Sequence, residues 1–348
     1  MLTKKIRVIL IDDSPVALAV IKSAIESDTS IQVVESFLNP KSALLHIPQI
    51  DPDVICVDFF MNGMDGLEFI KIVMSKFPKP VLVISRVVGS DSSKNIFDLI
   101  SAGAIDIIEK PTSGHPKDYL KTELIYKIKL ASGVKILSRK FDSNQKIITS
   151  SSHKRFNVIG IGASTGGPKT VYEILQNLPA SFPIPILVSQ HITFGFLNSL
   201  VQWMNKHLQL KVKIATNEEP LVAGYVYYAP ENTNLLVSQS KKTSLLPKTH
   251  QQTYCPSIDI MMNSIAQNYK QAAIGILLTG MGNDGAAGMK YLQSQGGMTI
   301  AQEETSCVIY GMPKAAIEQN AAQKILPPVD IAKYLMYLAK QHKSVPLL

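Results

Sequence analysis

The sequence has few cysteines and no long apolar run. Its 3 cysteines, Cys56, Cys255 and Cys307, lie far apart in 348 residues with no C-x-x-C spacing. This arrangement excludes a disulfide framework and a cysteine-based zinc site, so we expect reduced, buried thiols. No apolar stretch reaches the ~18 residues of a membrane-spanning helix, so we expect no membrane insertion. Internal repeats and low-complexity tracts are also missing.

The N-terminal segment lacks the apolar core of a signal peptide. It opens with basic residues, but its apolar run ends after about four residues at Asp12 and Asp13. We interpret it as the first strand of a cytoplasmic protein. The 46% hydrophobic content allows substantial cores, and the length favours two domains.

The net charge of +8 is confined to one segment. Residues 110–155 contain 11 Lys/Arg and 3 Asp/Glu, so the rest of the chain sums to zero. The segment begins with a helical pattern and continues as a polar stretch without apolar period, as is typical of a last helix and an interdomain linker. A solvated linker is the main interpretation, and docking to an acidic partner is the alternative.

On both sides of this segment short apolar runs alternate with helical patterns, which predicts two α/β units on largely parallel sheets. We predict a first domain at 1–131, a basic linker at 132–155 and a second domain at 156–348. The first unit has five strand patterns and matches a flavodoxin-like doubly wound domain. Its predicted strands are residues 6–11, 31–37, 53–59, 80–85 and 104–108.

Polar residues follow four of these strands where they end. Asp12 and Asp13 follow the first strand, Asp58 ends the third, Ser85 ends the fourth and Lys110 follows the fifth. Converging carboxylates repel one another, and a hard divalent cation such as Mg²⁺ relieves that repulsion. A carboxylate beside such a metal can act as the nucleophile in phosphoryl transfer. Lys110 would add a compensating charge, and Ser85 a hydroxyl for the new phosphoryl oxygen.

The first unit resembles the receiver domain of response regulators, in the stretches IDDSP, VDFFMNGMDG, VISR and the Lys-Pro pair at Lys110. The resemblance implies that Asp58 accepts phosphate from a histidine kinase and that Asp12, Asp13 and Asp58 hold Mg²⁺. Ile107 stands where receivers often carry an aromatic switch residue, so that switch is not expected here.

The loop after the phosphorylated Asp also departs from the receiver pattern, because Met61-Asn62 stands where Met-Pro is usual. We expect phosphoacceptance to survive this change. Many receivers control DNA-binding modules of roughly 60–110 residues. The second unit instead keeps alternating strands and helices over the 193 residues from 156 to 348, so DNA is not an expected partner.

The second unit opens with FNVIGIGASTGGPKTVYEILQNL, which predicts a strand, a tight turn and a helix. The spacing of its glycines is close to that of the phosphate-binding turn in dinucleotide-binding folds. In those folds the next strand ends in an acidic residue that binds the ribose, whereas here it ends in Gln190 and His191. The same turn reads G-x-S-x-G around Ser164, the nucleophile-elbow pattern. A serine nucleophile needs a base and an orienting acid, and His191 and Asp284 follow two other predicted strands.

The chain as a whole resembles the chemotaxis protein-glutamate methylesterases of the CheB family. The matching stretches are GIGASTGGPK, SQHITFGF, PSIDIMM, GILLTGMGNDGAAGM and TIAQEETSCVIYGMP, with the receiver in front. The resemblance implies a catalytic triad of Ser164, His191 and Asp284. The Thr165 N–H is the natural oxyanion donor, since it follows the nucleophile, and the family adds the Met281 backbone. Thr193-Phe194-Gly195 replaces a proline-containing run, which affects the expected substrate groove and not the chemistry.

By this resemblance the chain hydrolyses glutamate methyl esters on chemoreceptors and deamidates receptor glutamines, with no cofactor for the ester chemistry. The domain order implies that the receiver covers the triad until Asp58 is phosphorylated. Two other hypotheses stay open. One is a catalytically silent response regulator that only docks to receptors, and the other is a phosphorelay dehydrogenase that binds NAD at the glycine turn.

Overall fold

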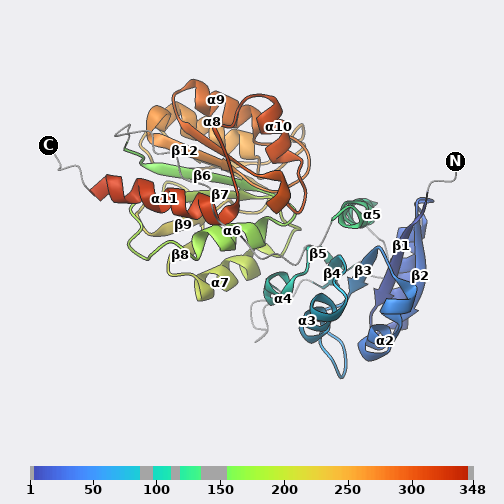
Figure 1. The fold of residues 1–348 in the computed structure, drawn as a ribbon. Helices are drawn as coiled ribbons and strands as arrows, with labels where there is room; N and C mark the ends of the chain where they lie inside the picture. Colours follow the sequence, from blue (N-terminus) through green and yellow to red (C-terminus); the bar gives the residue numbers. More distant parts are fainter. Residues whose placement is uncertain (1–3, 87–96, 111–117, 135–154, 344–348) are drawn as a thin grey trace. The chain divides into compact units, whose positions relative to one another are not determined.

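The computed structural model describes residues 4–86, 97–110, 118–134 and 155–343. The chain divides into two compact units, residues 1–141 and 142–348 (Figure 1). Most of the predicted linker, residues 135–154, lies outside the described residues, so its extent stays a prediction.

The first unit is built on a five-stranded parallel sheet in the order β2-β1-β3-β4-β5. Helix α1 packs against α5, and α3 packs against α2 and α4. This topology confirms the flavodoxin-like doubly wound fold. Because the strand order reverses between β1 and β3, their carboxyl ends form the crevice where such folds bind ligands. The elements are β1 (Ile6–Ile11), α1 (Pro15–Glu26), β2 (Ile31–Phe37), α2 (Pro40–Ile50), β3 (Val54–Val57), α3 (Gly66–Lys76), β4 (Val81–Ser85), α4 (Phe97–Ala102), β5 (Asp106–Glu109) and α5 (Asp118–Ser132).

Local signals set the boundaries of these elements. Ser14 begins α1 by accepting the Ala17 N–H, and Asp65 begins α3 in the same way with Glu68. Strand β5 starts two residues later than predicted, because the Ala104 N–H bonds back to Leu99 in α4. Capping side chains and helix ends therefore set the first residues of α1, α3 and β5.

The second unit has a seven-stranded parallel sheet in the order β14-β13-β12-β6-β7-β9-β8, with a separate antiparallel hairpin β10-β11. Figure 1 shows α8, α9 and α10 over one face of the sheet and α6, α7 and α11 over the other. The strands are β6 (Val158–Ala163), β7 (Ile186–Gln190), β8 (Lys211–Ile214), β9 (Tyr225–Tyr228), β10 (Thr233–Val237), β11 (Thr243–Pro247), β12 (Ala273–Leu277), β13 (Met298–Gln302) and β14 (Lys324–Leu326). The helices are α6 (Gly167–Leu175), α7 (Leu197–His207), α8 (Ile258–Tyr269), η1 (Lys270–Ala272), α9 (Ala286–Ser294), η2 (Glu304–Ser306), α10 (Met312–Glu318) and α11 (Pro328–Lys343).

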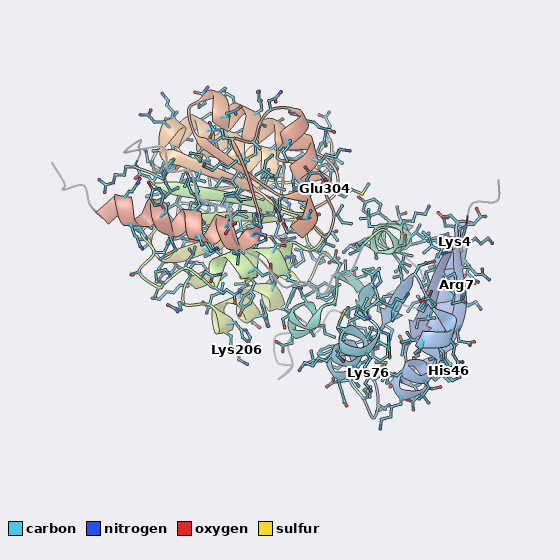
Figure 2. The ribbon with its side chains drawn as sticks, in the orientation of Figure 1. Lys4, Arg7, His46, Lys76, Lys206 and Glu304 are labelled. Atoms are coloured by element: carbon cyan, nitrogen blue, oxygen red, sulfur yellow. The ribbon has the colours of Figure 1, made fainter. Side chains whose placement is uncertain are left out.

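The core of each unit is its central strands. Every residue of β6, β7 and β12 is buried, as expected for parallel strands covered on both faces. Charged side chains such as Lys76 and Lys206 project outward from their own units in Figure 2. Of the three free cysteines only Cys56 is buried as expected, whereas Cys255 and Cys307 are half-buried because they lie in loops.

Candidate active site

The turn after β6 presents Ser164 at the carboxyl edge of the second sheet. The Ser164 N–H donates to the Thr279 carbonyl beyond β12 (3.0 Å), and the Ser164 carbonyl accepts the Gly167 N–H (2.8 Å). Gly166 sits between them with φ of 77°, a left-handed conformation that side chains disfavour. These contacts fix the backbone of the predicted nucleophile in a sharp strand-to-helix turn.

His191 and Asp284 meet above this edge. The imidazole Nε2 lies 2.9 Å from Asp284 Oδ2, and the His191 N–H donates to the Ala163 carbonyl (2.9 Å), one residue before Ser164. Strand β6 runs between β7 and β12, so the residues that follow these three strands converge. Since the Nε2–H bond to Asp284 occupies one ring nitrogen, Nδ1 carries the lone pair that can accept a proton.

Four donors hold the Asp284 carboxylate, whose side chain is 3% exposed. Besides His191 they are the Ser257 hydroxyl (3.1 Å) and the N–H groups of Ile258 (2.8 Å) and Asp259 (3.0 Å) at the start of α8. Burial alone would raise the pKa of Asp284, but the His191 contact and the helix N–H groups outweigh burial and lower it. Asp284 is therefore a carboxylate at neutral pH.

Two backbone donors are available beside the nucleophile. Among the described residues, neither the Thr165 N–H nor the Met281 N–H donates to a protein acceptor. A direct hydrogen bond between the Ser164 hydroxyl and the imidazole is likewise missing from the contacts of the described residues. Of the expected triad, His191 and Asp284 are therefore in contact. Ser164 comes directly after Ala163, the last residue of β6 that pairs with β7.

Three side chains that contact this site were not predicted from the sequence. The Tyr254 ring stacks on the His191 imidazole with centroids 5.1 Å apart and planes 3° apart. Ser257, which caps α8, also bonds Asp284, and its place just before the run IDIMM is a recognisable helix-start signal. Gln190, noted only as the end of a strand, donates to the carbonyls of Ser164 and His191.

The first unit brings its predicted polar residues together at the crevice. Lys110 Nζ lies 2.5 Å from Asp12 Oδ2 and 2.8 Å from Asp58 Oδ2, and all three side chains are buried. Burial raises the pKa of Asp58, and the Lys110 ammonium offsets only part of that rise. Burial alone would lower the pKa of Lys110, but its two carboxylate partners outweigh burial and raise it.

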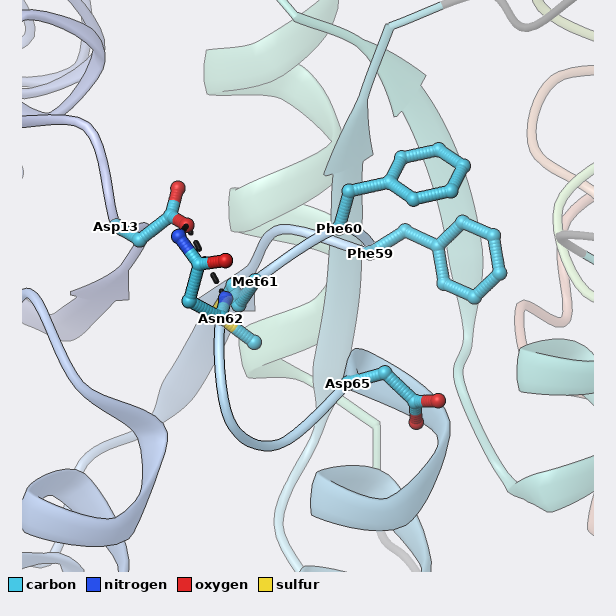
Figure 3. A pocket seen from close by; sticks show the side chains of 6 residues that line it. All are labelled: Asp13, Phe59, Phe60, Met61, Asn62 and Asp65. Atoms are coloured by element: carbon cyan, nitrogen blue, oxygen red, sulfur yellow. Dashed lines mark hydrogen bonds between the residues drawn. The ribbon is translucent and has the colours of Figure 1, made fainter.

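A pocket of about 360 Å³ is lined by Asp13 and by residues from the loop after β3, namely Phe59, Phe60, Met61, Asn62 and Asp65 (Figure 3). One oxygen each of Asp12, Asp13 and Asp58 can be chosen so that the three lie within 4.8 Å of one another, a donor set that fits a hard divalent cation. Asn62 lines the pocket. Its backbone N–H and its side-chain amide both donate to Asp13 Oδ2 (3.1 and 2.9 Å). The residue that departs from the receiver pattern therefore contacts an expected metal ligand.

Ser85 and Ile107 lie on the neighbouring strands. The Ser85 hydroxyl is fully buried with no protein partner in the described part of the chain, so it is available to an incoming oxygen. Ile107 is a buried strand residue whose carbonyl accepts from Lys127 Nζ (3.1 Å).

Comparison with known proteins gives the same division of the chain. The response regulator receiver domain model matches residues 8–119, and the CheB methylesterase model matches residues 159–335. A protein-glutamate methylesterase/protein-glutamine glutaminase of Syntrophus aciditrophicus is 34% identical over 96% of this chain and 98% of its own. One from Hahella chejuensis is 36% identical over 96% and 99%. The catalytic domain of Thermotoga maritima CheB methylesterase superimposes with a TM-score of 0.50 and 36% identity, covering 53% of this chain and 98% of that domain.

These matches and the two sheet edges define a response regulator whose output unit is a parallel-sheet α/β domain of the methylesterase class. The chain belongs to the CheB methylesterase family. In the described ranges, no helix combines the length and apolar character needed to cross a bilayer.

Proposed function

We propose that this chain is a phosphorylation-activated protein-glutamate methylesterase that acts on chemoreceptors in the cytoplasm and also deamidates receptor glutamines. The observation that carries the proposal is the contact between the half-buried His191 and the buried Asp284 at the sheet edge that presents Ser164. The names of the full-length relatives give the substrate class.

In the proposed reaction Ser164 Oγ attacks the side-chain carbonyl carbon of a glutamate methyl ester. His191 Nδ1 takes the hydroxyl proton, while Asp284 holds the Nε2–H tautomer and stabilises the imidazolium that forms. The Thr165 and Met281 N–H groups bind the developing oxyanion. Methanol leaves with the proton from His191, and water then attacks the acyl-enzyme by the reverse sequence to release glutamate. A glutamine amide follows the same path with ammonia as the leaving group.

We assign the control of this reaction to Asp58. Its buried carboxylate attacks the phosphorus of a kinase phosphohistidine, so an Asp58 O–P bond forms as the P–N bond breaks. In this proposal the phosphoryl oxygens are bound by Lys110, whose Nζ lies 2.8 Å from Asp58 Oδ2, and by the unpartnered Ser85 hydroxyl. Mg²⁺ held by Asp12, Asp13 and Asp58 would neutralise the charge of the transferred group. The phosphoryl group adds about −1.5 to −2 charges, which favours the active state only if the two states accommodate it differently.

The test is methanol release from a methylated receptor fragment, measured with and without acetyl phosphate and Mg²⁺. We expect release by the wild type to rise with the phosphodonor, and Ser164→Ala to reduce release to the uncatalysed level. Equal release by wild type and Ser164→Ala would contradict the esterase and support the silent docking regulator. Equal rates of methanol release with and without acetyl phosphate would contradict the control by Asp58.

A further inference from the structure

Beyond the last hydrogen bond of the β6–β7 ladder, a side chain joins the two loops. Ala163 pairs with Gln190 at the end of the ladder, and the His191 N–H to Ala163 carbonyl bond is its last rung. After that hydrogen bond the two segments leave the sheet in different directions. The segment after β6 enters the turn before α6, and the segment after β7 continues toward α7. Backbone pairing therefore bonds His191 to Ala163 but makes no direct bond between His191 and Ser164.

The Gln190 amide spans this gap. Its Nε2 lies 2.9 Å from the Ser164 carbonyl oxygen and 2.8 Å from the His191 carbonyl oxygen, so its two amide hydrogens serve one carbonyl each. The residue is 3% exposed. We propose that Gln190 is a positioning residue that fixes the spacing between Ser164 and His191 by donating to both backbone carbonyls. The inference rests on the proposed hydrolase function.

Two features distinguish this amide from an ordinary core residue. Gln190 Oε1 is buried and has no protein partner among the described residues, and a buried unpaired carbonyl oxygen destabilises the fold. An apolar side chain would avoid that cost, so the amide is explained by its donors. In addition, a Cβ on Gly167 would lie 2.4 Å from Gln190 Oε1, 2.8 Å from Ala163 Cβ and 2.9 Å from Gln190 Nε2, so this amide packs directly against the glycine of the turn.

The chain offers a matched control. The Asn268 side-chain amide also donates to two backbone carbonyls, those of Val237 (3.0 Å) and Ser264 (2.9 Å). Asn268 lies near the C-terminal end of α8, whereas the α8 N–H groups that bond Asp284 lie at the other end. Asn268→Leu thus removes the same kind of link without touching the carbonyls of the proposed nucleophile and base.

The experiment compares Gln190→Leu, Gln190→Glu, Gly167→Ala and Asn268→Leu in the full chain. Steady-state methanol release gives kcat and KM, and the labelling rate of Ser164 by a small fluorophosphonate reports nucleophile activation without the receptor. A catalytic geometry displaced by about 1 Å loses on the order of 10²-fold in rate. We expect Gln190→Leu to lower kcat and the labelling rate roughly 10- to 100-fold with KM within about twofold. A protonated Glu keeps one donor, so Gln190→Glu should fall between Leu and wild type.

Gly167→Ala displaces the Gln190 amide and also crowds Ala163 Cβ, so its defect should be at least as large as that of Gln190→Leu. Asn268→Leu should label and turn over at the wild-type rate. Labelling that is unchanged in Gln190→Leu would overturn the proposal, as would an equal loss in Asn268→Leu. Wild-type protein that labels at Ser164 but releases no methanol would refute the proposed substrate and leave the labelling comparison to decide the role of Gln190. Wild-type protein that neither labels nor turns over would overturn both.

Discussion

Replacing Asp284 by Asn tests the electrostatic role of the acid in the site. The Nε2–Oδ2 distance is 2.9 Å, so the imidazolium charge formed during attack lies close to the carboxylate. Two opposite charges about 3–4 Å apart attract by about 4–6 kcal/mol at an effective dielectric constant of about 20. Loss of that attraction in the transition state corresponds to a fall of about 10³- to 10⁴-fold in kcat.

The same replacement has a calculable effect on stability. Ser257 can reverse its hydroxyl to accept from an Asn amide, but the helix N–H groups of Ile258 and Asp259 cannot. The Ile258 N–H and the Asp259 N–H bond different oxygens of Asp284, so either orientation of Asn leaves one of them facing an amide nitrogen. We expect a loss of about 1–3 kcal/mol in the free energy of unfolding.

The assay is the initial rate of methanol release at saturating methylated receptor fragment, with acetyl phosphate and Mg²⁺ present. Unfolding of the second unit is followed by the fluorescence of Trp203, the chain's 1 tryptophan, which is buried in α7. Asp330→Asn removes an equal charge from the first turn of α11 and should leave both quantities near wild type. An Asp284→Asn protein that folds and keeps more than about one-tenth of the wild-type kcat would refute the electrostatic argument.

Three other predictions follow from the contacts described above. Asp58→Asn should abolish phosphorylation and the rise in methanol release with acetyl phosphate, while basal release and Trp203 fluorescence stay unchanged; a phosphodonor response in this variant would mean another acceptor. Asp284 has a lowered pKa in the folded protein, so its contribution to stability is complete above about pH 4, its unfolded value, and is lost as pH falls through the lower folded value. Wild type should therefore lose more stability than Asp284→Asn between pH 5 and 3 in denaturant titrations, and parallel losses would contradict this linkage. Tyr254→Ala should lower kcat roughly 3- to 10-fold by releasing the stacked His191 ring, an interaction of about 0.5–1.5 kcal/mol, whereas Tyr254→Phe should match wild type; equal rates in both variants would exclude a role for stacking.

The sequence alone determined the fold class and the edge of each sheet at which polar residues gather. Apolar runs of strand length, broken by capping residues such as Ser14 and Asp65, specify parallel α/β units, and residues that follow such strands share one edge. This local chemistry was sufficient to select Asp12, Asp58 and Lys110, which the structure brings into contact.

Only the tertiary structure decided which groups support these residues. Gln190 at the end of β7, Tyr254 in a loop and Ser257 at the start of α8 contact the site residues through pairings that no periodic pattern encodes. The antiparallel β10-β11 hairpin was missed for a related reason, because its strands pair with each other outside the main sheet. Pairing, stacking and capping between distant residues depend on distances in three dimensions. These distances become fixed only when the helices of the second unit have packed on its sheet.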